Sequence, residues 1–451
     1  MKRLYFGTDG VRGPYGGPLV NEVFFARLAA AAVKWLQSPA QGGPKKGNTF
    51  RVLIGRDTRG SGLALEHAVA CGLNSVGAQA ISLGVLPTPA VPIAVLATNA
   101  DLGIIITASH NAATDNGIKF FDSNGRKLSD ADESAIEQLL GEPVDIAPAT
   151  LTSSDAAIAD YIGTVRSILP PKALADWCIV LDTANGAACF TSPVVLRSLG
   201  AKVVAIGGTP DGTNINAGVG SEYPQTLAQT VLSVGAQLGI AHDGDGDRCV
   251  LCDEKGVVLD GDEILTILAL HTLKEGKLAN KILVVTVQSN IGVDAAVSAE
   301  GGQVLRTSVG DRYVIERMIA EGASLGGESS GHIICADVSK TGDGLVAALK
   351  VLEVMLATGL SLSQLRTRLR KYPQATSALR VVEKLDLVSC PSLSKAIVLL
   401  QSELAQNGRV LVRYSGTEPK IRLLVEGPDS ATVNDGIARL ESAVRLDLEV
   451  L

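Results

Sequence analysis

A single serine hydroxyl follows a short apolar run that ends in a turn. Residues 103–107 have the composition of a buried strand, and Ala108, Ser109, His110 and Asn111 follow them directly. In open α/β sheets ligands bind outside the carboxyl ends of the strands, so this order places Ser109 where a ligand can reach it. The same residues also fit an ordinary turn, because Ser and Asn side chains bond to nearby backbone. Since neighbouring side chains of an extended chain point to opposite sides, His110 is not expected to deprotonate Ser109.

Three carboxylates follow another apolar run at alternate positions. Asp243, Asp245 and Asp247 come after Leu238 to Ala241, with Arg248 behind them. Alternate residues of an extended chain face the same way, and carboxylates about 5 Å apart repel by about 3 kcal/mol per pair at an effective dielectric constant of about 20. A cation offsets that repulsion, and an all-oxygen ligand set favours Mg²⁺ or Ca²⁺ over zinc. A solvated acidic turn is the simpler alternative.

The run from Gly327 to His332, Gly-Glu-Ser-Ser-Gly-His, combines a carboxylate, two hydroxyls and an imidazole. It contains the GxSxG pattern of serine hydrolases, but their fold places the catalytic histidine well after the serine, and here the only histidine beyond Ser329 is His332. Glu328 and Ser330 are better suited to hydrogen bonding with sugar hydroxyls, with His332 as an acid or base. A Gly-rich turn without a role is the alternative.

A last cluster joins two guanidinium groups, two hydroxyls and a glycine. It comprises Arg413, Ser415, Gly416, Thr417 and Arg422. Arginines bind phosphate through charge-assisted hydrogen bonds, and a glycine lets backbone amides approach an anion. No GxxxxGK[ST] sequence occurs, so the signature of a nucleotide phosphotransferase is absent. A hairpin turn with surface arginines is the alternative.

Composition argues against several classes of protein. The net charge is −7, no basic stripe is present and only 4% of the residues are aromatic, which argues against a nucleic-acid surface. Apolar stretches are broken by charge or proline before a membrane-spanning length of about 20 residues, and the N-terminus has no apolar signal core. We therefore expect a cytoplasmic protein with no membrane contact. Seven cysteines, an odd number, fit free thiols better than a disulfide framework.

Strands and helices alternate in three successive units of about 100 residues each. The expected strands are Phe50 to Gly55, Ala78 to Gly84, Gly103 to Thr107, Cys178 to Asp182, Val203 to Ile206, Leu238 to Ala241, Ile282 to Val287, Val304 to Thr307 and Ser324 to Gly326. The expected helices are Leu63 to Val76, one from Pro89 with Thr88 as its N-cap, one near Pro193 to Leu199 and one from Pro224. The stretch Ser38 to Asn48 is expected to be a flexible surface loop.

Beyond Pro373 the pattern changes to a strand, a helix, two strands around Arg413 to Pro419 and a final helix from about Ser430. This order predicts a smaller α+β domain at the end of an α/β protein. The expected domains are residues 1–150, 151–255, 256–371 and 372–451. The first contains the turn with Ser109, the second the Asp cluster (Asp243, Asp245 and Asp247), the third the sugar-binding loop Gly327 to His332 and the fourth the phosphate-binding arginines.

These motifs give the chain a resemblance to a known family. Over essentially its full length it resembles the α-D-phosphohexomutase superfamily, and within it most closely the bacterial phosphoglucosamine mutases. The motifs that carry the resemblance are residues 6–13 (FGTDGVRG), 107–111 (TASHN), 115–119 (DNGIK), 243–248 (DGDGDR), 327–332 (GESSGH) and 413–419 (RYSGTEP). The resemblance implies three related α/β domains with mixed sheets and a C-terminal α+β domain, arranged around a central cleft.

The resemblance also implies a role for each of these residues. Ser109 would be a phosphoserine that binds one Mg²⁺ together with Asp243, Asp245 and Asp247. Glu328 and Ser330 would hold sugar hydroxyls. The non-reacting phosphate would be gripped by Arg413, Ser415, Gly416, Thr417 and Arg422. Charge stabilisation and proton transfer would come from Arg12, Lys119, Arg248 and His332.

The implied activity is the interconversion of glucosamine 6-phosphate and glucosamine 1-phosphate, for amino-sugar nucleotide and cell-wall precursor synthesis. A glucosamine 1,6-bisphosphate would be both intermediate and activator. Ser329 stands where glucosamine-specific members usually carry an amide residue, and Ala112 replaces a common proline, so a phosphomannomutase or phosphoglucomutase is an alternative. A non-catalytic sugar-phosphate binding protein is another, but it would not need Ser109 beside a metal triad. The expected partner is a phosphosugar, and a homodimer stays open.

Overall fold

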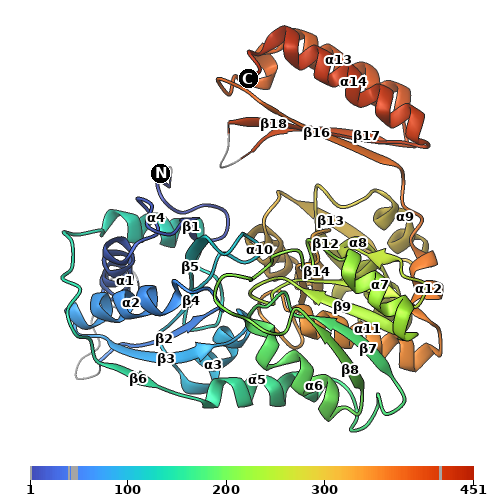
Figure 1. The fold of residues 1–451 in the computed structure, drawn as a ribbon. Coiled ribbons are helices and arrows are strands. Elements are labelled where there is room, and N and C mark those ends of the chain that lie inside the picture. Colours follow the sequence, from blue (N-terminus) through green and yellow to red (C-terminus); the bar gives the residue numbers. More distant parts are fainter. Residues whose placement is uncertain (1–2, 39–40, 42–48, 416–418) are drawn as a thin grey trace. The chain divides into compact units, whose positions relative to one another are not determined.

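The computed structural model describes residues 3–38, 41, 49–415 and 419–451. Backbone contacts divide the chain into two units, Met1–Val287 with Leu305–Arg368, and Gln288–Val304 with Leu369–Leu451. Three sheets lie mainly in the first, larger unit, and a fourth lies in the second, smaller unit (Figure 1).

The first sheet has six strands in the order β1-β5-β4-β2-β3-β6. β2 pairs in parallel with β3 and β4, β3 pairs in parallel with β6, and β5 pairs antiparallel with β4 and β1. The strands are β1 (Val11–Pro14), β2 (Arg51–Arg56), β3 (Gln79–Val85), β4 (Leu102–Ile106), β5 (Asp115–Phe121) and β6 (Leu151–Ser153). The helices of this part are α1 (Glu22–Leu36), α2 (Gly62–Ser75), α3 (Ala90–Thr98), α4 (Asp130–Gln138) and α5 (Ala156–Arg166).

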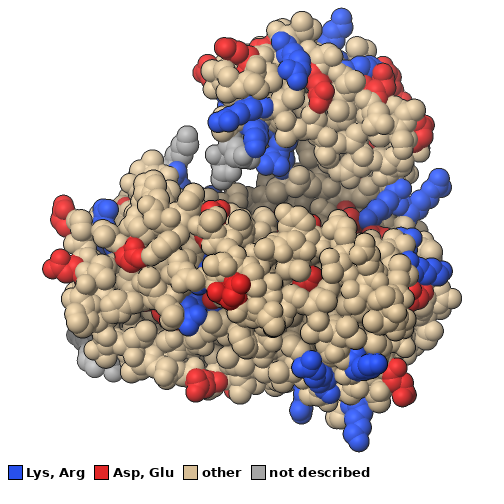
Figure 2. Space-filling view, in the orientation of Figure 1, with Lys and Arg blue, Asp and Glu red and all other residues tan. Residues whose placement is uncertain are grey.

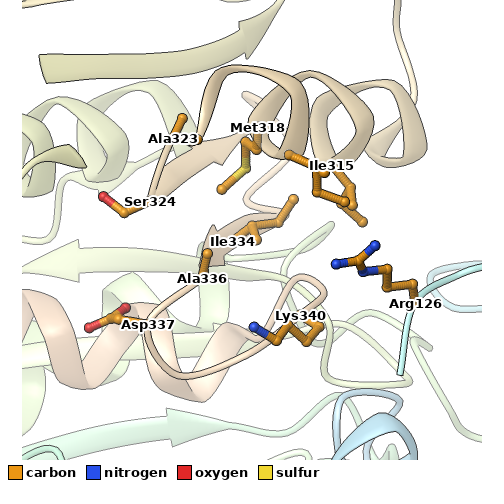
Figure 3. Close-up of a pocket in the computed structure, with 11 residues that line it drawn as sticks. Arg126, Ile315, Met318, Ala323, Ser324, Ile334, Ala336, Asp337 and Lys340 are labelled. Atoms are coloured by element: carbon orange, nitrogen blue, oxygen red, sulfur yellow. The ribbon is translucent and has the colours of Figure 1, made fainter. Parts of the chain in front are cut away.

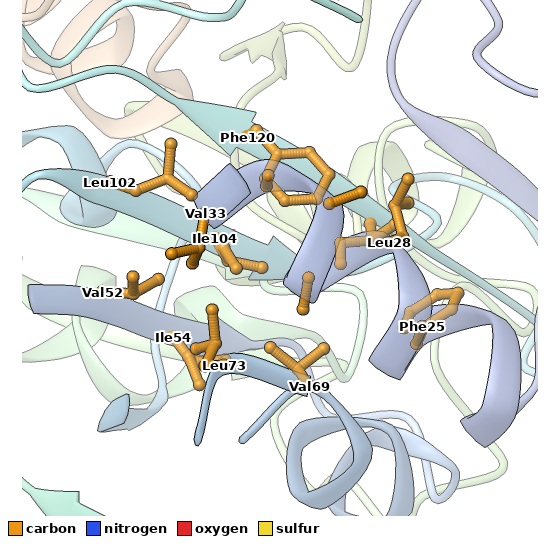
Figure 4. Close-up of a cluster of buried hydrophobic side chains, with 14 of the residues drawn as sticks. Phe25, Leu28, Val33, Val52, Ile54, Val69, Leu73, Leu102, Ile104 and Phe120 are labelled. Carbon is orange, nitrogen blue, oxygen red and sulfur yellow. The ribbon is translucent and has the colours of Figure 1, made fainter. Parts of the chain in front are cut away.

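Successive residues of the central strands pack against helices on opposite faces of this sheet. Val52 and Ile54 of β2 belong to a buried cluster with α1 and α2, and Figure 4 shows side chains of these elements pointing toward one another. Leu53, between them, lines a cavity with Ala94 of α3 and Ala157 of α5. Side chains that pack alternately on the two faces are those of a strand that is covered by helices on both sides. The carboxyl ends of these strands are therefore held firmly where the candidate residues follow.

The second sheet has the order β11-β10-β9-β7-β8. β7 pairs in parallel with β8 and β9, whereas β10 pairs antiparallel with β9 and β11. The strands are β7 (Cys178–Asp182), β8 (Lys202–Ile206), β9 (Leu238–His242), β10 (Cys249–Asp253) and β11 (Val258–Leu259). The helices here are η2 (Ala187–Phe190), α6 (Ser192–Ser198) and α7 (Gln225–Val234).

The third sheet has the order β13-β12-β14-β15, with β12 and β14 parallel and β14 and β15 antiparallel. The strands are β12 (Ile282–Thr286), β13 (Gln303–Thr307), β14 (Leu325–Gly327) and β15 (Ile333–Cys335). The helices are α8 (Gly261–Lys274), η3 (Ala279–Lys281), α10 (Asp311–Glu321), α11 (Gly344–Thr358), α12 (Leu362–Leu365) and η4 (Arg366–Arg368). A capping box of Asp260 and Glu263 starts α8, and Asp343 caps the first turn of α11.

The smaller unit contains an antiparallel sheet of order β16-β18-β17. Its elements are α9 (Gly292–Ala299), β16 (Gln374–Arg380), η5 (Leu387–Ser389), α13 (Pro391–Leu404), β17 (Arg409–Tyr414), β18 (Lys420–Glu426) and α14 (Ser430–Asp447). Ile421, Leu423 and Val425 of β18 pack in one cluster with residues of α13 and α14. Arg422 and Leu424 alternate with them and line a cavity on the sheet. The helices thus cover one face of the sheet, and the other carries the arginines.

The expected fold class is confirmed, because each of the three α/β sheets contains parallel and antiparallel pairs and the last unit is α+β. Each expected strand lies within one residue of its observed bounds. The domain boundaries stay a prediction, and two strands cross them: β6 pairs with β3 of the first sheet, and β11 pairs with β10 of the second.

Two further expectations concern the surface loop and the absence of a membrane-spanning helix. Most of the loop Ser38 to Asn48 lies outside the described residues. Within the described ranges, no single helix is long and apolar enough to cross a membrane; only α11 together with residues Leu362–Arg368, bent by 92°, reaches that length and hydropathy.

Candidate active site

Ser109 lies at the end of β4 in a left-handed backbone conformation, with a φ of +53°. Its side chain is fully buried, and its Oγ donates to Asp243 Oδ2 at 2.6 Å. The expectation that His110 points away is wrong, because the chain turns at Ser109 and His110 Nδ1 lies 3.4 Å from the Oγ. Burial and the nearby Arg248 lower the pKa of His110 to about 4, so the ring is neutral at neutral pH. The hydroxyl that was expected to be reachable is covered in this conformation.

A buried arginine that the sequence analysis missed fixes the turn around Ser109. Arg59 Nη2 donates to the carbonyl oxygens of Ser109 at 3.0 Å and Asn111 at 2.8 Å, and its Nη1 donates to two more carbonyl oxygens of the same segment. Its Nε donates to Asp57 at 2.9 Å, and neither side chain is exposed. The guanidinium therefore ties together four carbonyl groups along the irregular turn and fixes its shape.

The three carboxylates come together on a turn and not on an extended segment. Gly246 has a φ of +72°, and a Cβ on Gly244 would lie 2.6 Å from the Ser109 carbonyl oxygen. One oxygen each of Asp243, Asp245 and Asp247 lies within 4.8 Å of the others. The predicted clustering is confirmed, but its stated reason, alternate positions on an extended chain, is wrong.

The Asp cluster has oxygen atoms left for a divalent cation. Asp245 Oδ1 and Asp247 Oδ1 are buried and accept no hydrogen bond from a described residue. Burial, Asp245 and Asp247 raise the pKa of Asp243 well above its usual range. A bound cation relieves both costs, because it ligates the orphaned oxygens and offsets the repulsion. Three carboxylates form a hard oxygen set, so these residues fit Mg²⁺.

Lys119 of β5 lies between the Asp cluster and the N-terminal motif. Its Nζ is 3.0 Å from Asp245 Oδ2, 3.4 Å from Asp247 Oδ2 and 3.0 Å from Asp9 Oδ2. Burial alone would lower the pKa of Lys119, but these carboxylates outweigh burial and raise it. Asp9 also pairs with Lys127 at 2.7 Å. The centre therefore holds a buried, permanently charged ammonium group.

Arg12 and Arg248 are the partly exposed cations of this centre, with side chains 19% and 16% exposed. Arg12 pairs with Asp9. Arg248 Nε lies 3.8 Å from Asp247 Oδ1 and 4.0 Å from Asp243 Oδ2. The Nε atoms of both arginines are buried without a hydrogen-bond partner among the described residues. These two guanidinium groups are open to an anion that arrives from solvent, whereas Lys119 is buried.

Thr88 bonds to the Asp cluster and does not cap a helix. Helix α3 begins at Ala90 with Pro89 in the cap position and no side-chain cap, which corrects the expected N-cap. Thr88 Oγ1 donates to Asp245 Oδ2 at 2.6 Å, and the Thr88 N–H donates to the Asp245 carbonyl oxygen at 2.8 Å. A hydrogen bond from a hydroxyl to an ionised carboxylate is stronger than one between a hydroxyl and a neutral peptide N–H. The Thr88 hydroxyl therefore turns toward Asp245 and away from the helix end.

Glu328 and Ser330 lie on the loop between β14 and β15. Glu328 Oε1 accepts from the Gly310 N–H at 3.0 Å, and burial raises the pKa of its carboxyl. Ser330 Oγ is buried with no hydrogen-bond partner in the described part of the chain. The Cys249 N–H donates to the Gly331 carbonyl oxygen at 3.0 Å, which ties this loop to the second sheet. The loop thus presents an unused hydroxyl beside a carboxylate.

His332, at the end of the same loop, lies between two carboxylates. Its Nδ1 is 3.5 Å from Asp247 Oδ1, and its Nε2 is 3.3 Å from Asp311 Oδ2. Burial alone would lower its pKa, but Asp247 and Asp311 raise it. The Gly342 N–H donates to Nε2 at 3.1 Å, which requires the lone pair of a neutral ring. The carboxylates suit the charged ring and the Gly342 bond suits the neutral one, so the site accommodates both protonation states.

In the smaller unit Arg413 of β17 and Arg422 of β18 lie opposite each other. Burial and the neighbouring Arg422 lower the pKa of Arg413, and facing cations of this kind favour an anion between them. Both line a cavity of about 230 Å³. Figure 2 shows Lys and Arg side chains gathered at the end of this sheet that lies near the β17–β18 connection. Ser415 is buried and its carbonyl oxygen accepts from Lys384 at 2.6 Å, whereas Gly416 and Thr417 lie outside the described residues.

The larger unit therefore brings together most residues singled out from the sequence: Arg12, Ser109, Lys119, Asp243, Asp245, Asp247, Arg248, Glu328, Ser330 and His332. The sequence analysis missed Arg59, although Arg59 follows β2 as Ser109 follows β4, and this shared position was a usable signal. It also missed Lys127 and Asp311, which pair with each other. Lys127 follows no predicted strand, so no local pattern marks it. Asp311 comes shortly after the expected strand Val304 to Thr307, so the signal that marks Arg59 was available for it too.

The chain matches known proteins over nearly its full length. Residues 3–143, 159–256, 260–372 and 377–443 match, in order, the phosphoglucomutase/phosphomannomutase alpha/beta/alpha domains I, II and III and the C-terminal domain. The phosphoglucosamine mutase of Moorella thermoacetica is 45% identical over 443 residues, which cover 97% of this chain and 98% of the relative. That of Aeromonas salmonicida is 44% identical over 449 residues, covering 98% and 99%.

Solved structures show the same fold. A phosphoglucomutase/phosphomannomutase family protein from Burkholderia thailandensis aligns with a TM-score of 0.79 at 21% identity, covering 98% of each chain. An N-acetylphosphoglucosamine mutase of Aspergillus fumigatus, in complex with GlcNAc-6P and magnesium, aligns with a TM-score of 0.68 at 16% identity, covering 99% of this chain and 96% of that one. The chain belongs to the phosphoglucomutase/phosphomannomutase family and, within it, to the phosphoglucosamine mutases.

Proposed function

We propose that this protein is a phosphoglucosamine mutase that interconverts glucosamine 6-phosphate and glucosamine 1-phosphate through a phosphoserine at Ser109. The observation that carries the proposal is the 2.6 Å contact between Ser109 Oγ and Asp243, within a carboxylate cluster that also contacts Lys119. A nucleophilic hydroxyl beside a metal-type cluster and a buried cation is the combination that phosphoryl transfer requires.

In the first step the phosphoryl group of Ser109 moves to the free hydroxyl of the substrate. The bond between phosphorus and Ser109 Oγ breaks, a bond from phosphorus to the sugar oxygen forms, and the sugar hydroxyl proton leaves to a base. The resulting glucosamine 1,6-bisphosphate, which is also the proposed activator, reorients and returns its other phosphoryl group to Ser109. His332 suits the proton transfer, because its position between Asp247 and Asp311 accommodates both protonation states.

Cationic side chains balance the charge of the transferring group. Lys119 is buried and permanently charged beside Asp245, and Arg12 and Arg248 are the partly exposed guanidinium groups of the centre. Asp243, Asp245, Asp247 and the serine oxygen are the residues proposed to hold Mg²⁺. When bound, the cation would neutralise charge on the phosphoryl oxygens.

The remaining residues are proposed to hold and orient the sugar phosphate. Ser330 Oγ has no partner in the described part of the chain and Glu328 is buried, so both suit hydrogen bonds to sugar hydroxyls. The non-reacting phosphate would bind at a site formed by Arg413, Ser415, Gly416, Thr417 and Arg422. Its two facing arginines support this role, because together they form an anion site.

A coupled assay with glucosamine, glucose and mannose phosphates tests the proposal. The expected result is the highest kcat/KM with glucosamine phosphate, and turnover that depends on added bisphosphate. Ser329→Gln is the informative variant, because Ser329 occupies the position of the usual amide, and it should change the ratio among the three sugars while Ser75→Ala on α2 should not. A preference for glucose or mannose phosphate would instead identify the protein as a phosphoglucomutase or a phosphomannomutase. Binding of all three without turnover would leave a sugar-phosphate binding protein.

A further inference from the structure

A further cavity, of about 450 Å³, lies outside the candidate active site and shares no residue with it. Its volume is within the range of about 300–1,000 Å³ that is usual for small-molecule sites. It is lined by residues of α10, of the connection between α10 and β14, and of β15 with the segment that follows it, together with Arg126, which belongs to the turn after β5. Figure 3 shows Ile315, Met318 and Ile334 on one side and the side chains of Arg126 and Lys340 on the other.

One side of the cavity is apolar and partly open. Ile315, Met318 and Ile334 are buried at its base. Ile319, one turn along α10 from Ile315, also lines the cavity and is 51% exposed. An exposed isoleucine that continues a buried apolar surface favours an apolar ligand at this point.

The other side is cationic. Arg126 and Lys340 are exposed, and neither side chain forms an ion pair or hydrogen bond with a residue in the described ranges. Asp337 is the one carboxylate among the described lining residues, and it pairs with Lys350 at 2.9 Å. The two cations at the rim are therefore not neutralised by the cavity itself.

We propose that this cavity binds a small amphipathic anion. An aliphatic or aromatic body would lie against Ile315, Met318 and Ile334, and a carboxylate or phosphate head would accept hydrogen bonds from Arg126 and Lys340. The substrate does not suit this site, because the hydroxyls of a phosphosugar would be buried against isoleucine and methionine without partners. The ligand is thus of a different chemical class from the substrate of the proposed function.

The cavity is connected to the candidate active site through the chain itself. Arg126 precedes Lys127, which pairs with Asp9 and Asp311. Asp311 begins α10, and Ile315 lies one turn further along the same helix. An anion that draws Arg126 toward α10 would therefore act on both sides of the Lys127–Asp311 ion pair, so occupancy is expected to change the kinetic constants of the proposed mutase.

Methionine methyl NMR offers a direct test with octanoate as the probe. The chain has three methionines, of which Met318 lines the cavity whereas Met355 of α11 does not. Octanoate is expected to shift the Met318 methyl signal in a saturable way and to leave Met355 unchanged. Acetate, which lacks the apolar body, and octanol, which lacks the charge, should bind far more weakly. Glucose 1,6-bisphosphate should not displace octanoate, which separates this site from the proposed catalytic one.

Charge-removing variants complete the test. The double variant Arg126→Ala, Lys340→Ala should weaken octanoate binding at least about tenfold, as expected for lost charge-assisted hydrogen bonds. The control Arg317→Ala removes an exposed cation from α10 that pairs with Glu321 and does not line the cavity, so binding should be unchanged. No shift of Met318, or an equal shift in the double variant, would overturn the site. Unaltered kcat and KM in saturating octanoate would overturn its connection to the active site.

Discussion

Ser109 Oγ lies 2.6 Å from Asp243 Oδ2, although the two residues are 134 positions apart in the chain. The contact joins the turn after β4 in the first sheet to the turn after β9 in the second. Gly244 permits it, since a Cβ at that position would lie 2.6 Å from the Ser109 carbonyl oxygen. The hydroxyl that is proposed to carry the phosphoryl group therefore owes its surroundings to the packing of two sheets and not to a local motif.

Asp245→Asn is expected to raise the Mg²⁺ concentration needed for half-maximal activity by at least about tenfold, because a neutral amide is a weaker ligand for a hard cation. The substitution also removes the charged acceptor of Thr88 and Lys119. Titrating activity against Mg²⁺ measures the shift. Asp211→Asn, at an exposed carboxylate in the same part of the chain, is the control. Superimposable titrations of the two variants would remove the metal role from Asp245.

Arg59→Lys is expected to lower kcat more than it raises KM. A lysine ammonium keeps the charge opposite Asp57 but cannot bond Asp57 and the carbonyl oxygens of the Ser109 turn at once. Arg59→Ala should instead destabilise the protein by roughly 3–5 kcal/mol, because it leaves Asp57 buried and unpaired.

Steady-state kinetics and urea unfolding distinguish these effects of Arg59. Arg56→Lys is the matched control, since Arg56 lies on the same strand end and pairs with Glu66 at 3.1 Å, away from the turn. If Arg59→Lys turned over like the wild type, the turn would hold its shape without the guanidinium, and Arg59 would have no positioning role.

Arg422→Ala is expected to weaken substrate and bisphosphate binding together, by about 1.5 to 3 kcal/mol for a lost charged hydrogen bond. A bisphosphate that escapes before it reorients leaves Ser109 unphosphorylated, so released bisphosphate should accumulate and added bisphosphate should partly restore turnover. Arg439→Ala is the control, because Arg439 pairs with Glu403 at 2.6 Å on the helices of the same unit. Unchanged KM and no released bisphosphate would leave Arg422 as a surface residue of a hairpin.

Asp343 predicts a pH dependence of stability. Burial raises its pKa to about 6, from an ordinary value of about 4. The folded protein then binds this proton more tightly than the unfolded chain, so the free energy of unfolding falls as the pH rises from about 4 through about 6. Asparagine does not ionise and remains a good N-cap for α11, so Asp343→Asn should gain stability relative to the wild type over that interval. Urea unfolding of both proteins between these pH values measures the gain; a pH-independent difference would contradict it.

Apart from the short β6, the parallel strands could be predicted from the sequence, whereas the antiparallel strands beside them could not. Runs such as Cys178 to Asp182 are short, apolar and bounded by turn residues, which marks a strand buried on both faces. By contrast β1 contains Gly13 and Pro14, and β5 begins with Asp115 and Asn116. These segments become strands because β5 pairs with β4 of the existing sheet and β1 then pairs with β5. Their strand structure therefore depends on tertiary contacts that the local sequence does not show.

The same limit applies to the candidate site. Ser109 and the Asp cluster could be predicted because each follows a strand that has a clear apolar signature. Thr88 was misassigned because a threonine before a proline matches an N-cap, while its actual acceptor, Asp245, lies 157 positions away. The ion pair of Lys127 with Asp311 spans 184 positions and likewise leaves no mark on the local sequence.

The most direct test is to locate the phosphoryl group on the protein during turnover. The enzyme would be incubated with radiolabelled glucosamine 1,6-bisphosphate, digested and mapped, and a second sample would be chased with unlabelled glucosamine 6-phosphate. The account predicts label on the peptide that carries Ser109 and its loss in the chase at the rate of turnover. Ser109→Ala should carry no label and show no turnover, whereas Ser75→Ala should behave as the wild type. Label on another residue, or turnover by Ser109→Ala, would contradict the account.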